Sequence, residues 1–245
     1  MACEKSALTI PEWYRSLDAY TFDTRFVKLS PEAVAALAAG VDGGEKIAMD
    51  SEISQAVIAE LRKVMAELPG NCFVSVDSCA PTDTERFKSK GGAVYSAKSA
   101  WYYLVQSEKV AQAAANGEVK YICVRPYRHI SKAREFRLFI RDGKLRAMSQ
   151  YNLIRHFRRL EGVKKQYWRL AEELVSSIGW RLPAQDVVMD IYITAKKEII
   201  IIDFNCWGAP TDPLLLSWDA DWDNVAEMHI IPAPTKISGS VKVSF

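Results

Sequence analysis

Long apolar stretches are missing from this chain. No window approaches 18 uncharged apolar residues, the length that a membrane-spanning helix needs. The first 25 residues carry charged side chains throughout and contain no apolar segment of the kind found in signal peptides. We therefore expect neither a membrane span nor a secretory signal, and we expect a cytoplasmic protein.

Paired cysteines are also missing. The chain has five cysteines, an odd number, and no CxxC pair, so neither a disulfide framework nor a zinc site is indicated. A reduced chain is the simplest account. A nucleophilic role for Cys206 is the alternative, and it is disfavoured because nearby carboxylates raise the pKa of a thiol. The cysteines are Cys3, Cys72, Cys79, Cys123 and Cys206.

Several catalytic motifs are absent as well. The sequence contains no GxxxxGK[ST] phosphate loop, no GxSxG nucleophile elbow and no HExxH metalloprotease helix. Its three histidines, His129, His156 and His229, are scattered. These absences argue against P-loop NTPases, serine hydrolases and zinc proteases.

The overall composition is that of an ordinary globular protein. The chain has 245 residues, of which 49% are hydrophobic and 25% charged, with a formal net charge of +2. This length suits one large domain or two lobes. Basic residues crowd one region, which indicates either a solvated face or a site for phosphates or an acidic partner. They are Arg125, Arg128, Lys132, Arg134, Arg137, Arg141, Lys144, Arg146, Arg155, Arg158 and Arg159.

The hydrophobic pattern changes from helical spacing to strand spacing along the chain. Ser30-Pro31 starts a helix that ends at Gly40, and Pro69-Gly70 ends the next helix. Helices followed by mostly antiparallel strands around a polar face predict an α+β fold. We expect an N-terminal cap at 11–30, helices at 32–39, 51–68, 99–115 and 164–178, a polar loop at 81–92, strands at 72–76, 121–127, 135–140, 144–149, 187–193 and 199–205, and short strands in the tail 228–245, which includes Val241 and Val243.

A hairpin is predicted around Asp142-Gly143, a strong turn signal. A regular register from this turn places Glu135 opposite Gln150 and Arg137 opposite Met148. Glu135 and Arg137 then share a polar face, while Phe136, Leu138 and Ile140 fill the opposite face.

A second hairpin carries acidic groups inside two apolar strands. If Lys196-Lys197 form its two-residue turn, Asp190 lies directly opposite Asp203, with Asn205 two residues on along the same face. Opposed carboxylates repel and are costly to bury, so a cation is expected between them, and Mg²⁺ carrying phosphates fits best. In the alternative, both aspartates end their strands near solvent or pair with arginines.

Together the polar residues of the second half suit a nucleoside triphosphate site without a Walker loop. Carboxylates and an amide could hold magnesium, and arginines could bind phosphate oxygens. The basic segment 88–92 could cover the phosphates, or it is a plain exposed turn. The polar face collects Arg125, Glu135, Arg137, Gln150, Asp190, Asp203 and Asn205.

A set of short motifs makes the chain resemble the cell division cycle protein 123 family, a branch of the ATP-grasp superfamily. The motifs appear in order, with spacings similar to those of the family, from residue 13 to about residue 218. They are Trp13-Tyr14, 80–83 (APTD), Val124-Arg125, 135–140 (EFRLFI), Ser149-Gln150, 190–192 (DIY), 202–205 (IDFN), Gly208, Thr211-Asp212 and 214–218 (LLLSW).

The resemblance implies two lobes that grip ATP between antiparallel sheets, with Mg²⁺ in the cleft. The lobes are expected at 1–122, which includes the N-terminal cap, and at 123–245. By the same resemblance the metal ligands are Asp190, Asp203 and Asn205. Arg125 marks the strand beside the adenine-binding hinge, while Glu135, Arg137 and Gln150 line the cleft.

The chain also departs from the family pattern. The positions of two family lysines hold Ser75 and Val94, and lysines of the small lobe normally contact ATP phosphates in this superfamily. Lys88, Lys90 or Lys98 is a candidate replacement. The acidic insert near the N-terminus of eukaryotic members is missing and the C-terminal tail is short, so we expect a compact, divergent, prokaryotic member.

Two functions follow from the resemblance. Eukaryotic members resemble assembly chaperones that bind the gamma subunit of translation initiation factor 2. ATP-grasp enzymes instead activate a carboxylate as an acyl phosphate for attack by an amine, and here Arg137 would be the catalytic charge stabiliser. Transfer of a phosphoryl or nucleotidyl group to protein or RNA, and a non-catalytic binding module, are further alternatives. We expect ATP and a protein client or a small carboxylate as partners, and no membrane.

Overall fold

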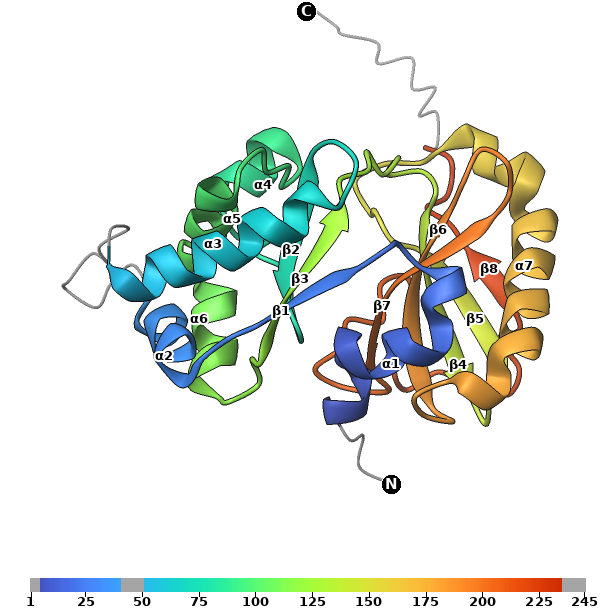
Figure 1. Cartoon of the computed structure of the whole chain (residues 1–245). Coiled ribbons are helices and arrows are strands. Elements are labelled where there is room, and N and C mark those ends of the chain that lie inside the picture. The colour runs from blue at the N-terminus through green and yellow to red at the C-terminus, as the bar shows by residue number, and fades with distance from the viewer. Residues whose placement is uncertain (1–4, 41–50, 235–245) are drawn as a thin grey trace, which may run out of the picture.

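Two β-sheets lie side by side, each with its own helices (Figure 1). The computed structural model describes residues 5–40 and 51–234. Within them the smaller sheet has three antiparallel strands in the order β1-β3-β2, and the larger sheet has five in the order β7-β6-β4-β5-β8. Only the pairing of β5 with β8 is parallel among these strands. The predicted α+β class with two sheets is confirmed.

The small sheet carries most of the helices. Its strands are β1 (Arg25–Lys28), β2 (Cys72–Val76) and β3 (Tyr121–Pro126). One buried cluster joins these strands to the helices around them, including Leu61, Trp101 and Ile122. The helices are α2 (Pro31–Ala39), α3 (Glu52–Ala66), α4 (Glu85–Lys90), α5 (Ala97–Val105) and α6 (Glu108–Ala115).

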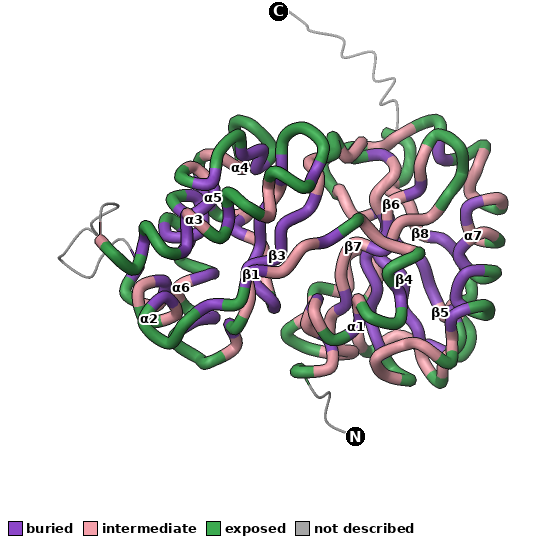
Figure 2. Tube along the Cα trace, in the orientation of Figure 1, coloured by how far each residue is buried: buried purple, intermediate pink, exposed green. Residues whose placement is uncertain are grey.

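The large sheet has two different faces. A long helix, α7 (Arg158–Ile178), and the N-terminal helix α1 (Ile10–Leu17) supply residues to the buried cluster on one face, together with Phe136, Leu138 and Ile140. Figure 2 shows buried segments of this sheet next to the two helices, with stretches of intermediate exposure between them. The strands are β4 (Glu135–Arg141), β5 (Lys144–Gln150), β6 (Val187–Ile193), β7 (Ile199–Cys206) and β8 (Glu227–His229), and short 3₁₀ turns lie at Lys5–Leu8, Asp18–Tyr20 and Gly179–Arg181.

Side-chain caps set the starts of five helices. In each, a serine or threonine at the N-cap accepts a hydrogen bond from the backbone N–H three residues on, which satisfies one of the free donors of the first turn. The cap at Ser30 and the end at Gly40 confirm the predicted first helix. The capping residues are Ser30, Ser51, Thr84, Ser96 and Ser107.

Two of these caps correct predictions. The expected polar loop at 81–92 contains helix α4, which Thr84 caps and Gly91 ends with φ 61°. The single helix expected at 99–115 is two helices, α5 and α6. Ser107 interrupts it because its hydroxyl caps α6 while donating to the Asp83 carboxylate at 2.6 Å.

The β4–β5 hairpin turns at Asp142-Gly143, as predicted, with φ values of 51° and 67°. However, its register is shifted by one residue. A bulge beside Phe139 adds a residue to β5, so Arg137 lies opposite Ser149 and Gln150 lies opposite Phe136. The predicted pairing of Glu135 with Gln150 and of Arg137 with Met148 is therefore wrong.

The β6–β7 hairpin places Asp190 opposite Asp203, as predicted, but its turn and register differ from those predicted. Ile193 pairs with Ile199, so the turn is one residue longer than the predicted Lys196-Lys197 turn, and Lys197 has φ 69°. A bulge at Ile202 then adds one residue to β7 and brings the two aspartates opposite each other.

The remaining expectations have mixed outcomes. Helical residues at 164–178 are confirmed within α7, and one short strand of the expected tail is β8. Val241 and Val243 lie outside the described residues. Helix α1 lies in the core of the large sheet, and the lobe boundary expected between residues 122 and 123 stays a prediction.

Candidate functional site

A row of polar residues crosses all five strands of the large sheet. Strand pairing places Asp203, Asp190, Arg137, Ser149 and His229 directly opposite one another in turn. Opposed residues share a face, so these side chains leave the sheet on the same side. We call this set the polar row.

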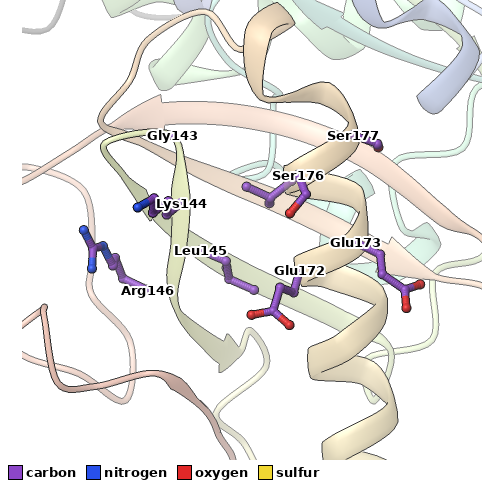
Figure 3. Close-up of a pocket in the computed structure, with 9 residues that line it drawn as sticks. Gly143, Lys144, Leu145, Arg146, Glu172, Glu173, Ser176 and Ser177 are labelled. Carbon is purple, nitrogen blue, oxygen red and sulfur yellow. The ribbon is translucent and has the colours of Figure 1, made fainter.

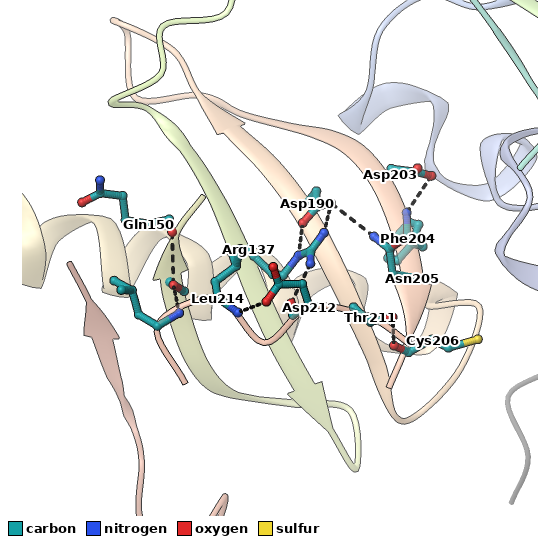
Figure 4. Close-up of polar contacts among 12 residues, drawn as sticks. Arg137, Gln150, Asp190, Asp203, Phe204, Asn205, Cys206, Thr211, Asp212 and Leu214 are labelled. Atoms are coloured by element: carbon teal, nitrogen blue, oxygen red, sulfur yellow. Dashed lines mark hydrogen bonds and ion pairs between the residues drawn. The ribbon is translucent and has the colours of Figure 1, made fainter. Parts of the chain in front are cut away.

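The centre of the polar row is a buried ion pair (Figure 4). Arg137 donates from Nε and Nη2 to the two Asp190 carboxylate oxygens at 2.7 and 2.8 Å, and both side chains are 8% exposed. Its Nη1 donates to the Asp212 carbonyl at 2.7 Å. Asn205 donates from Nδ2 to Asp190 Oδ2 at 3.2 Å. The alternative in which an aspartate of this hairpin pairs with an arginine is confirmed for Asp190.

Asp203 lacks such a partner among the described residues. Its one hydrogen bond there comes from the backbone N–H of Phe204 at 2.9 Å. Burial, followed by repulsion from Asp190, raises the pKa of Asp203 to about 7, and attraction to Arg125 offsets only part of this. A carboxylate whose charge is so poorly compensated is a place where a cation would be stabilising.

Arg125 reaches this region from the other sheet. It donates from Nε to Thr24 Oγ1 at 3.2 Å and from Nη1 to the carbonyl of Ile202, the bulge residue of β7, at 3.0 Å. Its guanidinium carbon lies 5.8 Å from the Trp13 ring centroid. Burial lowers the pKa of Arg125, and its Nη2 is buried without a hydrogen-bond partner within the described residues. Arg125 thus fastens the small sheet to the strand that carries Asp203.

Glu135 begins β4, two residues before Arg137 on the same face. Burial, and then repulsion from Asp190, raises the pKa of Glu135 to about 7. Tyr151, which sequence reasoning missed, lies with its ring centroid 5.2 Å from the Arg137 guanidinium carbon. Burial raises the pKa of Tyr151 to about 12, so its hydroxyl stays protonated near neutral pH.

Gln150 lies elsewhere. Because the bulge moves it opposite Phe136, it does not share the face of Arg137, contrary to the predicted arrangement. Its side chain is fully buried and forms hydrogen bonds with backbone groups. Nε2 donates to the carbonyls of Asn152 and Arg155, and Oε1 accepts from the N–H of Ile231. A ligand-binding role for Gln150 stays a prediction that these bonds disfavour.

The candidate phosphate lysines lie at the surface of the small lobe. Lys88 is paired with Glu85 at 2.6 Å, and Lys88, Lys90 and Lys98 are exposed. The segment is the end of α4 rather than a plain turn, and the Lys90 carbonyl accepts from Tyr127 Oη at 3.3 Å, just after β3. Nucleotide contact by these lysines stays a prediction.

An aromatic cluster lies beside the polar row, and sequence reasoning missed it. Phe139 is 5.1 Å from Trp222 and 5.8 Å from Trp218, and Trp207 is 4.8 Å from Trp222, between ring centroids. Trp218 Nε1 donates to the Thr211 carbonyl at 2.8 Å. The cluster therefore holds the segment after β7 over the sheet, where the Asp212 carbonyl meets Arg137. The family motifs between Gly208 and Trp218 marked this segment in the sequence, but they did not indicate its contacts with Phe139.

Cys206 follows Asn205 and is disulfide-bonded, which corrects the expected reduced state at this position and excludes it as a free nucleophile. Cys72, Cys79 and Cys123 are free. Within 5–40 and 51–234, no three His, Cys, Asp or Glu side chains gather closely enough to hold a metal ion, and no helix is long and apolar enough to cross a membrane.

A separate hollow lies between the β4–β5 turn and the last turns of α7 (Figure 3). Lys144, Arg146, Glu172 and Glu173 line it together with serines. None of the predicted site residues lines this hollow. Its lining carries both acidic and basic side chains, so it does not favour a ligand of either charge.

This chain belongs to the D123 family, whose sequence profile matches residues 44–229. Two solved structures share its fold. Cdc123 from Schizosaccharomyces pombe superposes with a TM-score of 0.74 at 19% identity, covering 89% of this chain and 91% of that one. A C-terminally truncated form of that protein gives 0.77 at 20% identity, covering 93% and 97%.

The curated relatives that the chain resembles include proteins with one shared name. A translation initiation factor eIF2 assembly protein from Kluyveromyces lactis is 35% identical over 120 residues, which cover 45% of this chain and 32% of that protein. The Dictyostelium discoideum protein of the same name is 24% identical over 181 residues, covering 69% and 46%. The chain thus spans less than half the length of these relatives. Both are eukaryotic, and they give no support to the expected prokaryotic origin.

Proposed function

We propose that this chain binds a nucleotide with Mg²⁺ at the polar row and in that state supports assembly of translation initiation factor eIF2. The observation that carries the nucleotide part is the half-buried carboxylate of Asp203, whose negative charge Arg125 and Arg137 offset only in part. The partner comes from the names of the curated relatives. Such a role would place the protein in the cytoplasm.

The residues present fit a magnesium ion in part. Asp203 has carboxylate oxygen to offer, and Asn205, whose nitrogen faces Asp190, has its amide oxygen. Asp190 fits only if it shares its oxygens with Arg137, which occupies both. When bound, the ion would neutralise Asp203 and the phosphate oxygens at once.

The state of Arg137 favours assembly over ligation. A ligase needs an arginine that is free to stabilise charge as the phosphoryl group moves. Three of the five N–H groups of Arg137 are already donated, two to Asp190 and one to the Asp212 carbonyl, and the Asp190 carboxylate offsets its charge. Nucleotide binding with little turnover is the conclusion that this geometry supports, and the ligase and transferase alternatives lack a comparable observation.

Calorimetric titration with ATP, with and without Mg²⁺, tests the nucleotide part. We expect binding that requires Mg²⁺ in the natural protein and its loss in Asp203→Ala, with the folded state retained. Equal ATP·Mg²⁺ affinity in the two proteins would show that the proposed metal site is wrong. Release of ADP and phosphate on a mixture of carboxylates and amines would restore the ligase alternative.

Co-purification with the isolated gamma subunit of eIF2, the subunit that the family resemblance implies, tests the partner part. We expect a complex in ATP and Mg²⁺ that Asp203→Ala weakens. Absence of a complex under all conditions would remove the assembly role and leave nucleotide binding unaffected.

A further inference from the structure

Two surface segments lie side by side where the chain leaves the sheets. Residues 128–134 run from β3 to β4, and residues 153–159 run from β5 into α7. Arg159 Nη2 donates to Ser131 Oγ at 3.0 Å and ties the segments together. In Figure 1 both cross the side of the molecule at which α7 begins. We call this pair of segments the basic ridge.

The basic ridge carries more positive charge than the acidic groups beside it offset: Glu161 lies 3.3 Å from His156 Nε2, and Glu135 interacts with Lys132. Neither segment contains an aspartate or glutamate. Among the residues that the structure describes, none of its arginines or its lysine takes part in an ion pair. Unpaired charge of one sign on a surface attracts ligands of the opposite sign. These residues are Arg128, Lys132, Arg134, Arg155, Arg158 and Arg159.

The start of α7 adds a second signal. Its N-cap, Phe157, makes no side-chain hydrogen bond, and Arg158 and Arg159 precede the single acidic residue of the first turn, Glu161. Cations at a helix N-terminus oppose the helix dipole and destabilise the helix locally. Local stability therefore does not explain these arginines. An acidic group from outside would satisfy both the free backbone donors and the guanidinium groups.

Exposed aliphatic side chains on the second segment favour a protein ligand over a nucleic acid. Leu153 is 41% exposed and Ile154 is 72% exposed. Single-stranded nucleic acid is typically held by exposed aromatic rings on which bases stack. Here the neighbouring Phe157 instead packs against the core. Exposed aliphatic residues within a basic surface suit a protein segment that combines acidic and apolar side chains.

The ridge is also connected to the polar row. Its segments join the ends of β4 and β5, which carry Arg137 and Ser149. Buried Gln150 fixes the second segment by donating to the carbonyls of Asn152 and Arg155. Gln150 therefore helps to hold the second segment in place.

We propose that the basic ridge docks an acidic segment of a partner protein, with Leu153 and Ile154 contacting an apolar side chain within that segment. This inference rests on the proposed partner role and deepens it by naming the surface and the chemistry of the partner. The chain's own tail is a poor occupant, because residues 235–245 contain two lysines and no acidic residue.

A defined peptide tests the chemistry. We would measure fluorescence anisotropy of a labelled twelve-residue peptide of glutamates flanking two leucines, at low salt, with the full chain. Arg155→Glu/Arg158→Glu should weaken binding by at least about tenfold, since exposed interface charges steer association. Ile154→Ser should weaken it about threefold. Arg62→Glu, an exposed arginine on α3, is the matched control and should bind as the natural protein does.

Three outcomes would overturn the inference. Equal peptide binding by the charge-reversed and natural proteins would remove the ridge as the docking site. Equal binding of a peptide with serines in place of leucines would remove the apolar contact. Tighter binding of a single-stranded RNA oligonucleotide, lost in the same double variant, would make the ridge a nucleic-acid surface.

A parallel measurement with the eIF2 gamma subunit separates this inference from the proposed function. If the gamma subunit binds Arg155→Glu/Arg158→Glu as well as it binds the natural protein, the ridge is overturned and the assembly role stands. If the gamma subunit does not bind but the peptide does, with the expected losses, the ridge stands and the assembly role is overturned. ATP·Mg²⁺ affinity should be unchanged in the double variant, which verifies its fold.

Discussion

Asp190 and Asp203 lie opposite each other on neighbouring strands, yet their surroundings differ. Asp190 has both oxygens bound by Arg137 and receives a further bond from Asn205. Asp203 has one bond from its own strand and a pKa raised to about 7. The difference shows that position in a sheet does not decide the role of a carboxylate. Asp190 is held by an ion pair within the fold, whereas Asp203 is the carboxylate that we propose for the metal ion.

The largest expected effect comes from removing the satisfied partner. Asp190→Ala leaves Arg137 buried with an uncompensated charge, so we expect the free energy of unfolding to fall by about 3–5 kcal/mol. Urea denaturation followed by circular dichroism measures it. The paired change Arg137→Met/Asp190→Leu should recover most of this loss, because no buried charge remains. A double variant as unstable as Asp190→Ala would contradict this account of the pair.

Arg125→Met should have the next largest effect. The change removes hydrogen bonds to Thr24 and to the Ile202 carbonyl, so we expect a loss of about 1–3 kcal/mol in the same denaturation assay. Exposed Arg62→Met is the matched control and should change stability by less than about 0.5 kcal/mol. Equal stability of both variants would show that Arg125 does not fasten the two sheets.

Asp203→Asn should change how the free energy of unfolding depends on pH. The folded pKa of Asp203 lies above its usual value, so the folded state binds more protons than the unfolded state between about pH 4 and pH 7. The natural protein therefore loses stability across this window as pH rises, and the amide variant should lose less. Glu135 titrates in the same range in both proteins and cancels in the difference. Parallel stability curves for the two proteins between pH 4 and pH 7 would contradict the raised pKa.

The smallest effect is expected from the surface lysines. Simultaneous change of Lys88, Lys90 and Lys98 to Ala should leave stability within about 0.5 kcal/mol, since all three are exposed. If they replace the lysines missing at Ser75 and Val94, ATP affinity should fall about tenfold. Calorimetry that finds the same affinity would remove them from the nucleotide site.

Much of the fold follows from local signals that act over a few residues. Capping serines and the Asp142-Gly143 turn predict where elements begin and turn, and most strands lie where the apolar runs are. The prediction of a loop at 81–92 was wrong because Thr84 caps a short helix within this polar stretch. The single helix at 99–115 failed because Ser107 both caps α6 and bonds Asp83 far back in the sequence.

The candidate site was predicted only in part, because β-bulges and distant contacts are not visible in local sequence signals. The opposition of Asp190 and Asp203 was correct although the predicted turn was wrong, because the longer loop and the bulge at Ile202 offset each other. Gln150 was assigned to the wrong face because a bulge beside Phe139 shifts alternation by one residue. The tryptophan cluster lies far along the chain from Phe139, and no local pattern shows such contacts.

The sequence by itself determined the α+β class, the polar residues on otherwise apolar strands and the concentration of positive charge between residues 125 and 159. These properties depend on residue type and on spacing within an element. Only the tertiary structure decided that Arg137 neutralises Asp190, that the charge of Asp203 is compensated only in part, and that two basic segments meet at Ser131 and Arg159. The physical reason is that charge compensation and burial depend on which distant groups come within a few ångströms, and strand register and bulges set those distances.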